Sequence, residues 1–419
     1  MAEAPTGFLR GKTRRLFVKS PAPWLSLGVP APASPPFPEI PPPEAPFTVI
    51  APGRVNLIGE HTDYNDGLVL PMAIEPHLRI EVSPRKDRWM LLSSDRHAEP
   101  PRRYDLTRRL APSDCAGSWS AYPCGVVAGF QQLGWQIPGF EARISATLPS
   151  GGGLSSSAAL EVGLATALEA LCQKRLPPEE KALLAQKAEH AFAGVPCGIM
   201  DQFAVTFGKA GHAMLLDCRT RALRYVELND ASIAVLVLNS GVKHRLAESA
   251  YARRRSECQS AAKALGVSSL REVDSRLWES QQASLPEIER RRARHVLTEN
   301  ERTLRLVRAL ERGDFQAAGD ALYGSHASLS GDYAVSCKEL DLLVEIARGI
   351  DGIFGCRMTG GGFGGCAVAL IQTAKAGDIQ DAFRHRYQAA TGMNPAMFLT
   401  QPTEGAALQI PSWRRAGRG

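Results

Sequence analysis

A run of glycines and serines that leads directly into a helix constrains the fold of this chain more than any other segment. Residues 148–158 read Leu-Pro-Ser-Gly-Gly-Gly-Leu-Ser-Ser-Ser-Ala, and the helical face that follows carries Leu160, Leu164, Leu168 and Leu171. Glycines let the backbone approach a ligand, hydroxyls donate hydrogen bonds, and a helix N-terminus offers unpaired amides. The segment predicts a phosphate cradle, with a plain linker as the alternative. It is not a Walker A loop, because it contains no lysine.

The apolar periodicity along the chain predicts the fold class. Strands, recognised by β-branched or alternating apolar residues, are expected at 47–50, 68–70, 78–82, 233–238 and 366–371. Turns are expected at Pro52-Gly53 and, in a tight hairpin, at Asn65-Asp66-Gly67. Helices are expected directly after the glycine-serine run and at about 179–192, closed by Gly194, 251–265 and 287–312. This mixture predicts an α+β protein with two lobes.

The proline content divides the chain further. Residues 21–46 hold 11 of the 29 prolines, too many for a helix or a sheet. We therefore expect 1–46 to be a disordered, Pro-rich tail, with an N-terminal lobe over 47–222 and a C-terminal lobe over 223–419. A targeting peptide or a ligand for a proline-binding domain is the alternative reading of the tail.

Charge and cysteine usage exclude several classes of protein. A net charge of +6 from 49 basic and 43 acidic residues is too small to favour nucleic acid, and the basic helix around Arg290–Arg294 is better read as solvated surface. The apolar runs are far shorter than the ~20 residues of a membrane helix. Nine cysteines without a C-x-x-C pair indicate free thiols in a reducing compartment, so we expect a cytoplasmic protein.

Two polar segments are candidates for ligand binding. Residues 53–64 place Arg54, Glu60, His61 and Asp63 between two expected strands, a set of donors and acceptors suited to a polyhydroxylated ligand. A solvated turn with an internal ion pair is the alternative, and a metal site has less support. Asp201 stands among apolar residues after a helix, where a carboxylate either caps a helix or takes part in chemistry.

A second glycine-rich segment lies at 359–365. It formally matches G-x-G-x-x-G, but the residues that follow it, 366–371, are β-like, whereas a dinucleotide fingerprint precedes a helix. We therefore expect a glycine turn that feeds a strand. Close approach of the backbone to a ligand and tight packing at a corner both remain open.

Four of these segments together resemble one family. They read G-R-V-N-L-I-G-E-H-T-D-Y at 53–64, L-P-S-G-G-G-L-S-S-S-A at 148–158, G-I-M-D-Q-F at 198–203 and T-G-G-G-F-G-G-C at 359–366. This order resembles the GHMP small-molecule kinase superfamily, and within it the animal-type galactokinases, from about Phe47 to about residue 400. The resemblance implies a two-lobed GHMP kinase fold with the active site between the lobes. It also implies transfer of the γ-phosphoryl group of ATP to the 1-hydroxyl of α-D-galactose, in galactose catabolism.

The resemblance also implies roles for single residues. Asp201 would be the catalytic base and Arg54 would assist it. The sugar would contact Arg54, Glu60, His61, Asp63, Gly198, Asp201 and Tyr251. ATP would contact Gly151, Gly152, Gly153, Leu154, Ser155, Ser156, Ser157 and Trp119, and Mg²⁺ would be held by Ser157 and Glu189. Pro123, shortly after Trp119, predicts a kinked helix beside the nucleotide.

Other functions remain open at this level. An N-acetylgalactosamine kinase is disfavoured because residues 61–65 and 360–366 follow the galactose pattern. A galactose sensor without activity is disfavoured because the Ser157-Ala158 pair is present. We expect galactose and ATP as partners, no nucleic acid and no membrane, and a monomer or a weak homodimer.

Overall fold

The computed structural model describes residues 45–149, 152–243 and 247–409. The tail expected over 1–46 lies outside these residues except at its last two positions. Among the described residues, no helix is both long and apolar enough to cross a membrane. The expected division at 222 and 223 stays a prediction, and the hairpin formed by β7 and β8, over 212–227, crosses it.

The largest sheet carries the N-terminal polar segment. Its strands, in the order of hydrogen-bonded neighbours, are β13 (Ala407–Leu408), β1 (Phe47–Asn56), β3 (Pro71–Arg85), β6 (Gly139–Ala146), β4 (Trp89–Ser94) and β5 (His97–Asp105). All neighbours are antiparallel except β4 and β6, which are parallel. Strand β1 thus contains the strand expected at 47–50 and continues into the polar segment that starts at residue 53.

Two expected turns in this region are wrong. The chain does not turn at Pro52-Gly53, because β1 continues to Asn56 and only its register with β3 shifts there. Asn65-Asp66-Gly67 does not close a tight hairpin either. A single 3₁₀ turn, Asp63–Asn65, ends with Asp66 in the left-handed conformation at φ 58°, and the strand that follows pairs elsewhere.

Two smaller sheets complete the strands. One has the order β10 (Ile353–Thr359), β11 (Gly364–Gln372), β9 (Ile233–Lys243) and β12 (Ala396–Thr400). The other has the order β2 (Leu68–Val69), β7 (His212–Asp217) and β8 (Leu223–Glu227). The glycine turn expected within 359–365 is the connection from β10 to β11, and the strand expected after it is confirmed.

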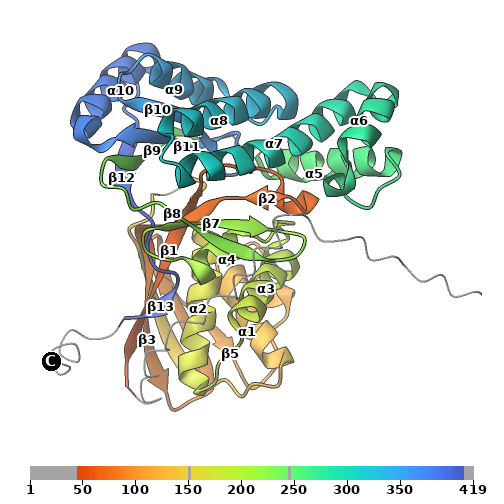
Figure 1. Ribbon diagram of the computed structural model, residues 1–419. Helices are drawn as coiled ribbons and strands as arrows, with labels where there is room; N and C mark the ends of the chain where they lie inside the picture. Colours follow the sequence, from red (N-terminus) through yellow and green to blue (C-terminus); the bar gives the residue numbers. More distant parts are fainter. Residues whose placement is uncertain (1–44, 150–151, 244–246, 410–419) are drawn as a thin grey trace, which may run out of the picture. The chain divides into compact units, whose positions relative to one another are not determined.

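The helices are α1 (Ala121–Gln132), α2 (Ser156–Cys172), α3 (Pro178–Ala188), α4 (Met200–Phe207), α5 (Ala247–Ala264), α6 (Ser275–Gln281), α7 (Glu287–Glu311), α8 (Phe315–Ser328), α9 (Lys338–Arg348) and α10 (Ala376–Thr391). The expected helices are thus present. Helix α2 packs on β1 and β3, whereas α8 and α9 pack on β10 (Figure 1). After α3 the chain continues as a π-helical turn, Glu189–Ala193. This turn ends at Gly194, which adopts the left-handed conformation.

The kink expected at Pro123 is absent. Helix α1 begins at Ala121, so Pro123 lies in its first turn. The amides of the first turn have no partner within a helix, and a proline there removes no hydrogen bond.

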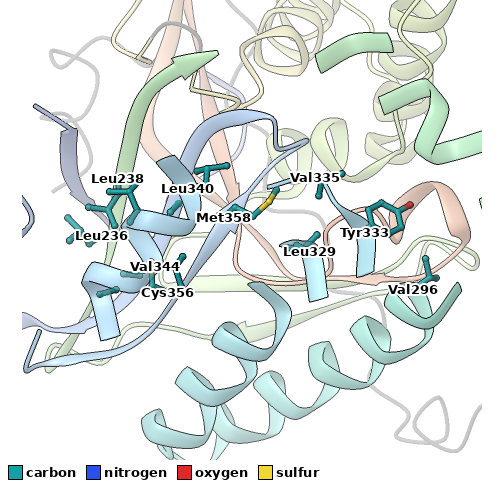
Figure 2. Packing of buried hydrophobic residues seen from close by; sticks show 14 of the residues in the cluster. Leu236, Leu238, Val296, Leu329, Tyr333, Val335, Leu340, Val344, Cys356 and Met358 are labelled. Atoms are coloured by element: carbon teal, nitrogen blue, oxygen red, sulfur yellow. The ribbon is translucent and has the colours of Figure 1, made fainter. Parts of the chain in front are cut away.

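A large apolar core packs against the four-stranded sheet. Leu236 and Leu238 of β9 pack with Cys356 and Met358 of β10 and with residues of α9. At the other end of the same cluster lies Tyr333, at the end of a π-helical turn that follows α8, Leu329–Tyr333 (Figure 2). This core therefore reaches from the sheet to the segment that holds Tyr333.

Candidate active site

An ion pair between Asp201 and Arg54 lies at the centre of the site. Arg54 is on β1 and is buried, and Asp201 is in the first turn of α4. Arg54 Nε donates to Asp201 Oδ1 at 2.8 Å and an Arg54 terminal nitrogen donates to Oδ2 at 2.9 Å, so the pair is bidentate. The Ser155 hydroxyl also donates to Oδ2. Oδ1 thus receives a single hydrogen bond from the described residues.

The glycine-serine run folds around this pair. The other terminal nitrogen of Arg54 donates to the carbonyl of Gly153 at 2.6 Å, and the amide of Arg54 donates to the carbonyl of Leu154 at 3.1 Å. Gly53 makes this approach possible, because a Cβ atom there would lie 2.3 Å from Leu148 Cδ2. Ser155 adopts the left-handed conformation at φ 60° immediately before α2, so the run changes direction where the helix starts.

The two glycine-rich segments meet. A Cβ atom on Gly360 would lie 3.1 Å from the carbonyl oxygen of Gly153, and one on Gly152 would lie 3.1 Å from the sulfur of Cys366. Between them is a cavity of about 330 Å³. Its lining includes Arg54, Asp201, Thr359 and the residues of the two segments over 152–157 and 361–365. The second segment therefore packs closely against the first and lines the cavity, and its approach to a ligand stays a prediction.

Glu60 is held on both carboxylate oxygens. Oε1 accepts from the Gly360 amide at 2.7 Å and from the Thr359 hydroxyl at 3.1 Å, while Oε2 accepts from Asn56 and pairs with Arg357 at 2.9 Å. Burial raises the pKa of Glu60, and the charge of Arg357 offsets part of that effect. Glu60 thus connects the polar segment after β1 with the end of β10.

Four more of the expected residues lie close together in two pairs, His61 with Tyr251 and Asp63 with Gly198. The centroid of the His61 ring lies 5.6 Å from that of the Tyr251 ring, and His61 Nδ1 is 2.8 Å from the Tyr64 hydroxyl. Asp63 lies against Gly198, where a Cβ atom would come 1.7 Å from Asp63 Oδ2, so no larger residue fits there without displacing the carboxylate. Burial and the neighbouring charge of Asp201 raise the pKa of Asp63 to about 7.

The expected Mg²⁺ ligands lie on two elements, Ser157 in the first turn of α2 and Glu189 in the π-helical turn after α3. Glu189 Oε2 accepts from Gln202 Nε2 at 2.7 Å and from the Cys197 thiol at 3.2 Å. Burial raises the pKa of Glu189, partly offset by the hydrogen bond from Cys197. A carboxylate and a hydroxyl fit Mg²⁺, which takes few protein oxygens and completes its shell with water and phosphate. No group of three His, Cys, Asp or Glu side chains suited to a metal occurs among the described residues.

One expected nucleotide contact, Trp119, stands apart from this arrangement. Trp119 stacks on His97 with ring centroids 5.3 Å apart and planes 7° from parallel, and it is not among the residues that line the cavity. Gly151 lies outside the described residues.

Several residues that organise the site carry little local signal in the sequence. Arg357 is fully buried, and its guanidinium donates to the carbonyls of Asn56 and Leu57 at 3.0 and 3.1 Å. Glu299 of α7 accepts from the Gly59 amide at 3.0 Å. The only local signal for Arg357 is its place among apolar residues in a strand. Glu299 belongs to a helix with many charged residues, and its sequence neighbours do not distinguish it from them.

Comparison with known proteins gives one consistent result. The family model for the N-terminal domain of GHMP kinases matches residues 121–209, that for their C-terminal domain matches 306–389, and the galactokinase galactose-binding signature matches 39–84. The galactokinase of Homo sapiens is 46% identical over 371 residues, which are 87% of this chain and 93% of that protein. The galactokinase of Roseiflexus is 42% identical over 372 residues, with coverages of 87% and 94%.

Solved structures agree with these matches. The galactokinase of Lactococcus lactis in complex with galactose superimposes with a TM-score of 0.82 at 33% identity, covering 87% of this chain and 95% of that one. The mevalonate kinase of Methanococcus jannaschii superimposes with a TM-score of 0.62 at 18% identity, covering 87% and 100%, which is a likeness of fold alone.

Proposed function

The chain belongs to the galactokinases of the GHMP kinase family and phosphorylates galactose with ATP, and from this premise we propose how its residues divide the work. Asp201 is the base, and the 1-hydroxyl of α-D-galactose is the nucleophile. That oxygen forms a bond to the γ-phosphorus while the bond from the γ-phosphorus to the oxygen bridging to the β-phosphate breaks. The hydroxyl proton passes to Asp201, and ADP leaves.

The hydrogen bonds of Asp201 support this assignment. Oδ2 accepts from both Arg54 and Ser155, whereas Oδ1 accepts only from Arg54 among the described residues. Oδ1 therefore retains a lone pair for the sugar hydroxyl. The arginine fork holds the carboxylate in one orientation, and this pre-organisation matters because phosphoryl transfer depends mostly on positioning and charge.

The cavity between the glycine segments is proposed to take the phosphates of ATP. Residues 152–157 supply backbone amides and hydroxyls at the N-terminus of α2, where an anion is favoured. Arg54 borders the same cavity and lies close to the charge that develops on the transferred group. Trp119 is proposed to lie near the adenine. We also propose Gly151 as a phosphate contact, on the basis of its place in the glycine-serine run.

Ser157 and Glu189 are proposed to hold Mg²⁺. When bound, the ion would neutralise phosphate charge and thereby favour transfer. The support is the place of Ser157 in the cavity lining and the burial of the Glu189 carboxylate, since a buried anion gains from a cation beside it.

The sugar is proposed to contact the group formed by Arg54, Glu60, His61, Asp63, Gly198, Asp201 and Tyr251. The support is the contact between the His61 and Tyr251 rings, the tight contact of Gly198 with Asp63, and the hydrogen-bonded pair of Arg54 and Asp201. We also propose a cytoplasmic location, which is supported by the nine free thiols. A monomer or a weak homodimer stays a prediction.

The convergence of Asp201, Arg54 and the glycine-serine run on one cavity is the observation that carries this proposal. Its test is ADP release by the purified chain with Mg·ATP and a panel of galactose, glucose, N-acetylgalactosamine, mevalonate and homoserine. We expect turnover with galactose well above the rest. Equal turnover with N-acetylgalactosamine, or none with any sugar, would contradict it.

A further inference from the structure

We propose that Tyr333 and Cys258 are positioning residues for galactose recognition, because their side chains continue a hydrogen-bonded chain that ends on His61. The inference rests on the proposed contact between His61 and the sugar. It deepens that proposal by naming two residues that lie outside the sugar-binding segments and act through another side chain.

The chain crosses three separate parts of the sequence. His61 Nδ1 lies 2.8 Å from the Tyr64 hydroxyl, that hydroxyl lies 2.9 Å from the Tyr333 hydroxyl, and the Tyr333 hydroxyl lies 3.0 Å from the sulfur of Cys258. Cys258 is on α5, two turns after Tyr251 on the same face. Each member can donate or accept, so the four groups form an uninterrupted series.

Tyr333 is held rigidly at the centre of this series. Its side chain is fully buried, and its ring lies 4.8 Å from the His61 ring and 4.4 Å from the His295 ring. Figure 2 shows it at the end of the apolar cluster. Arg254 donates to the Tyr333 carbonyl at 2.7 Å, which fixes the backbone as well. The hydroxyl therefore has a set position from which to orient Tyr64.

His61 needs such support because its local conformation is unfavourable. Its φ is 64°, a left-handed value that a side chain rarely adopts without compensation. Its Nε2 is buried and forms no hydrogen bond with the described residues. A buried ring nitrogen without a firm partner is suited to a sugar hydroxyl, and its direction is set by what holds Nδ1.

Two substitutions test the chain by steady-state kinetics. Tyr333→Phe keeps the ring and removes the hydroxyl, and we expect the KM for galactose to rise about tenfold while kcat stays within about threefold and the KM for ATP is unchanged. Cys258→Ser keeps a hydrogen-bonding group and should leave the galactose KM within about twofold, whereas Cys258→Ala should raise it about threefold.

A matched control is Tyr387→Phe. Tyr387 is also fully buried in the same core, but its hydroxyl donates to the Ser240 carbonyl at 2.9 Å, away from His61. This variant should lose stability without a change in the KM for galactose. If Tyr333→Phe changes the KM values for galactose and ATP equally, or changes neither, the positioning role is wrong.

Nitrogen NMR of the histidine side chains separates this proposal from the one it rests on. The His61 signals, identified by their loss in His61→Asn, should shift in Tyr333→Phe and stay in place in Tyr387→Phe. Unchanged His61 signals in Tyr333→Phe would overturn the hydrogen-bonded chain. A galactose KM that is unaffected by His61→Asn would overturn the proposed sugar contact of His61 instead.

Discussion

The guanidinium of Arg357 and the carboxylate of Glu60 form an ion pair of 2.9 Å, with both side chains buried. Arg357 comes from β10, and Glu60 follows β1, so the pair joins the polar segment at 53–64 to the four-stranded sheet. The same arginine also donates to two carbonyls at the end of β1. The polar segment is thus braced from the opposite half of the chain.

Removing one partner of this pair should strongly destabilise the protein. We expect Arg357→Met to lower the free energy of unfolding by about 3–5 kcal/mol, because Glu60 is then a buried charge without its cation. Denaturant unfolding measures this. Arg384→Met, which breaks the exposed pair with Asp381, is the control and should change stability by less than about 0.5 kcal/mol. Similar losses in both variants would contradict the role of Arg357.

Asp201→Asn should remove turnover and leave the fold intact. The amide keeps the shape of the side chain but cannot accept the proton, so we expect kcat to fall by about 10²–10⁴. ADP release and thermal unfolding measure the two properties. Asp378→Asn, an exposed aspartate in the first turn of α10, is the matched control and should retain full activity. Undiminished turnover by Asp201→Asn would show that another group is the base.

Glu189→Gln should weaken the binding of Mg²⁺. We expect the Mg²⁺ concentration for half-maximal activity to rise about 10- to 100-fold, because one of the two proposed oxygen ligands loses its charge. Binding of Mn²⁺ followed by paramagnetic resonance gives a readout independent of turnover. Glu180→Gln, exposed near the start of α3, should behave as the unmodified chain. An unchanged metal affinity in Glu189→Gln would exclude Glu189 as a ligand.

Asp63 should make stability depend on pH near neutrality. Its pKa is about 7 in the folded protein, raised by burial and by Asp201 from an ordinary value near 3.8. Between these values the folded state binds more protons than the unfolded state, so the contribution of Asp63 to stability falls as pH rises through 7. Asp63→Asn should therefore gain at least about 1 kcal/mol relative to the unmodified chain between pH 5 and pH 8.

Denaturant unfolding at the two pH values checks this prediction. The two proteins share every other titrating group. The contribution of the buried histidines to the pH dependence of stability is therefore the same in both and cancels in the difference. A pH-independent difference between Asp63→Asn and the unmodified chain would mean that the carboxyl titrates in the folded state as it does in the unfolded one.

Local patterns were sufficient for much of the site. The glycine-serine run before a helical face predicted the loop and α2, and the loop indeed borders the cavity with Asp201. The charged cluster over 53–64 and the isolated Asp201 were both recognised from residue type. These signals are short-range, because a helix start, a glycine turn and a buried carboxylate each depend on neighbours within a few residues.

Two expectations were wrong because tertiary contacts overrode a local pattern. Pro52-Gly53 has the composition of a turn, but pairing with β3 along ten residues outweighs it and leaves only a shift of register. Pro123 predicts a kink only if the helix starts earlier, and its start at Ala121 depends on how α1 packs on α2 and α3. In both cases tertiary contacts decided where an element begins or ends.

By itself, the sequence determined the mixed helix and strand content, the phosphate-type loop, the candidate base and the family to which the chain belongs. Only the tertiary structure decided that Arg357 pairs with Glu60 and that Tyr333 connects Tyr64 to Cys258. The physical reason is that a charge or hydroxyl in an apolar element gives no local sign of its partner. Its position is set by desolvation and packing across the folded chain.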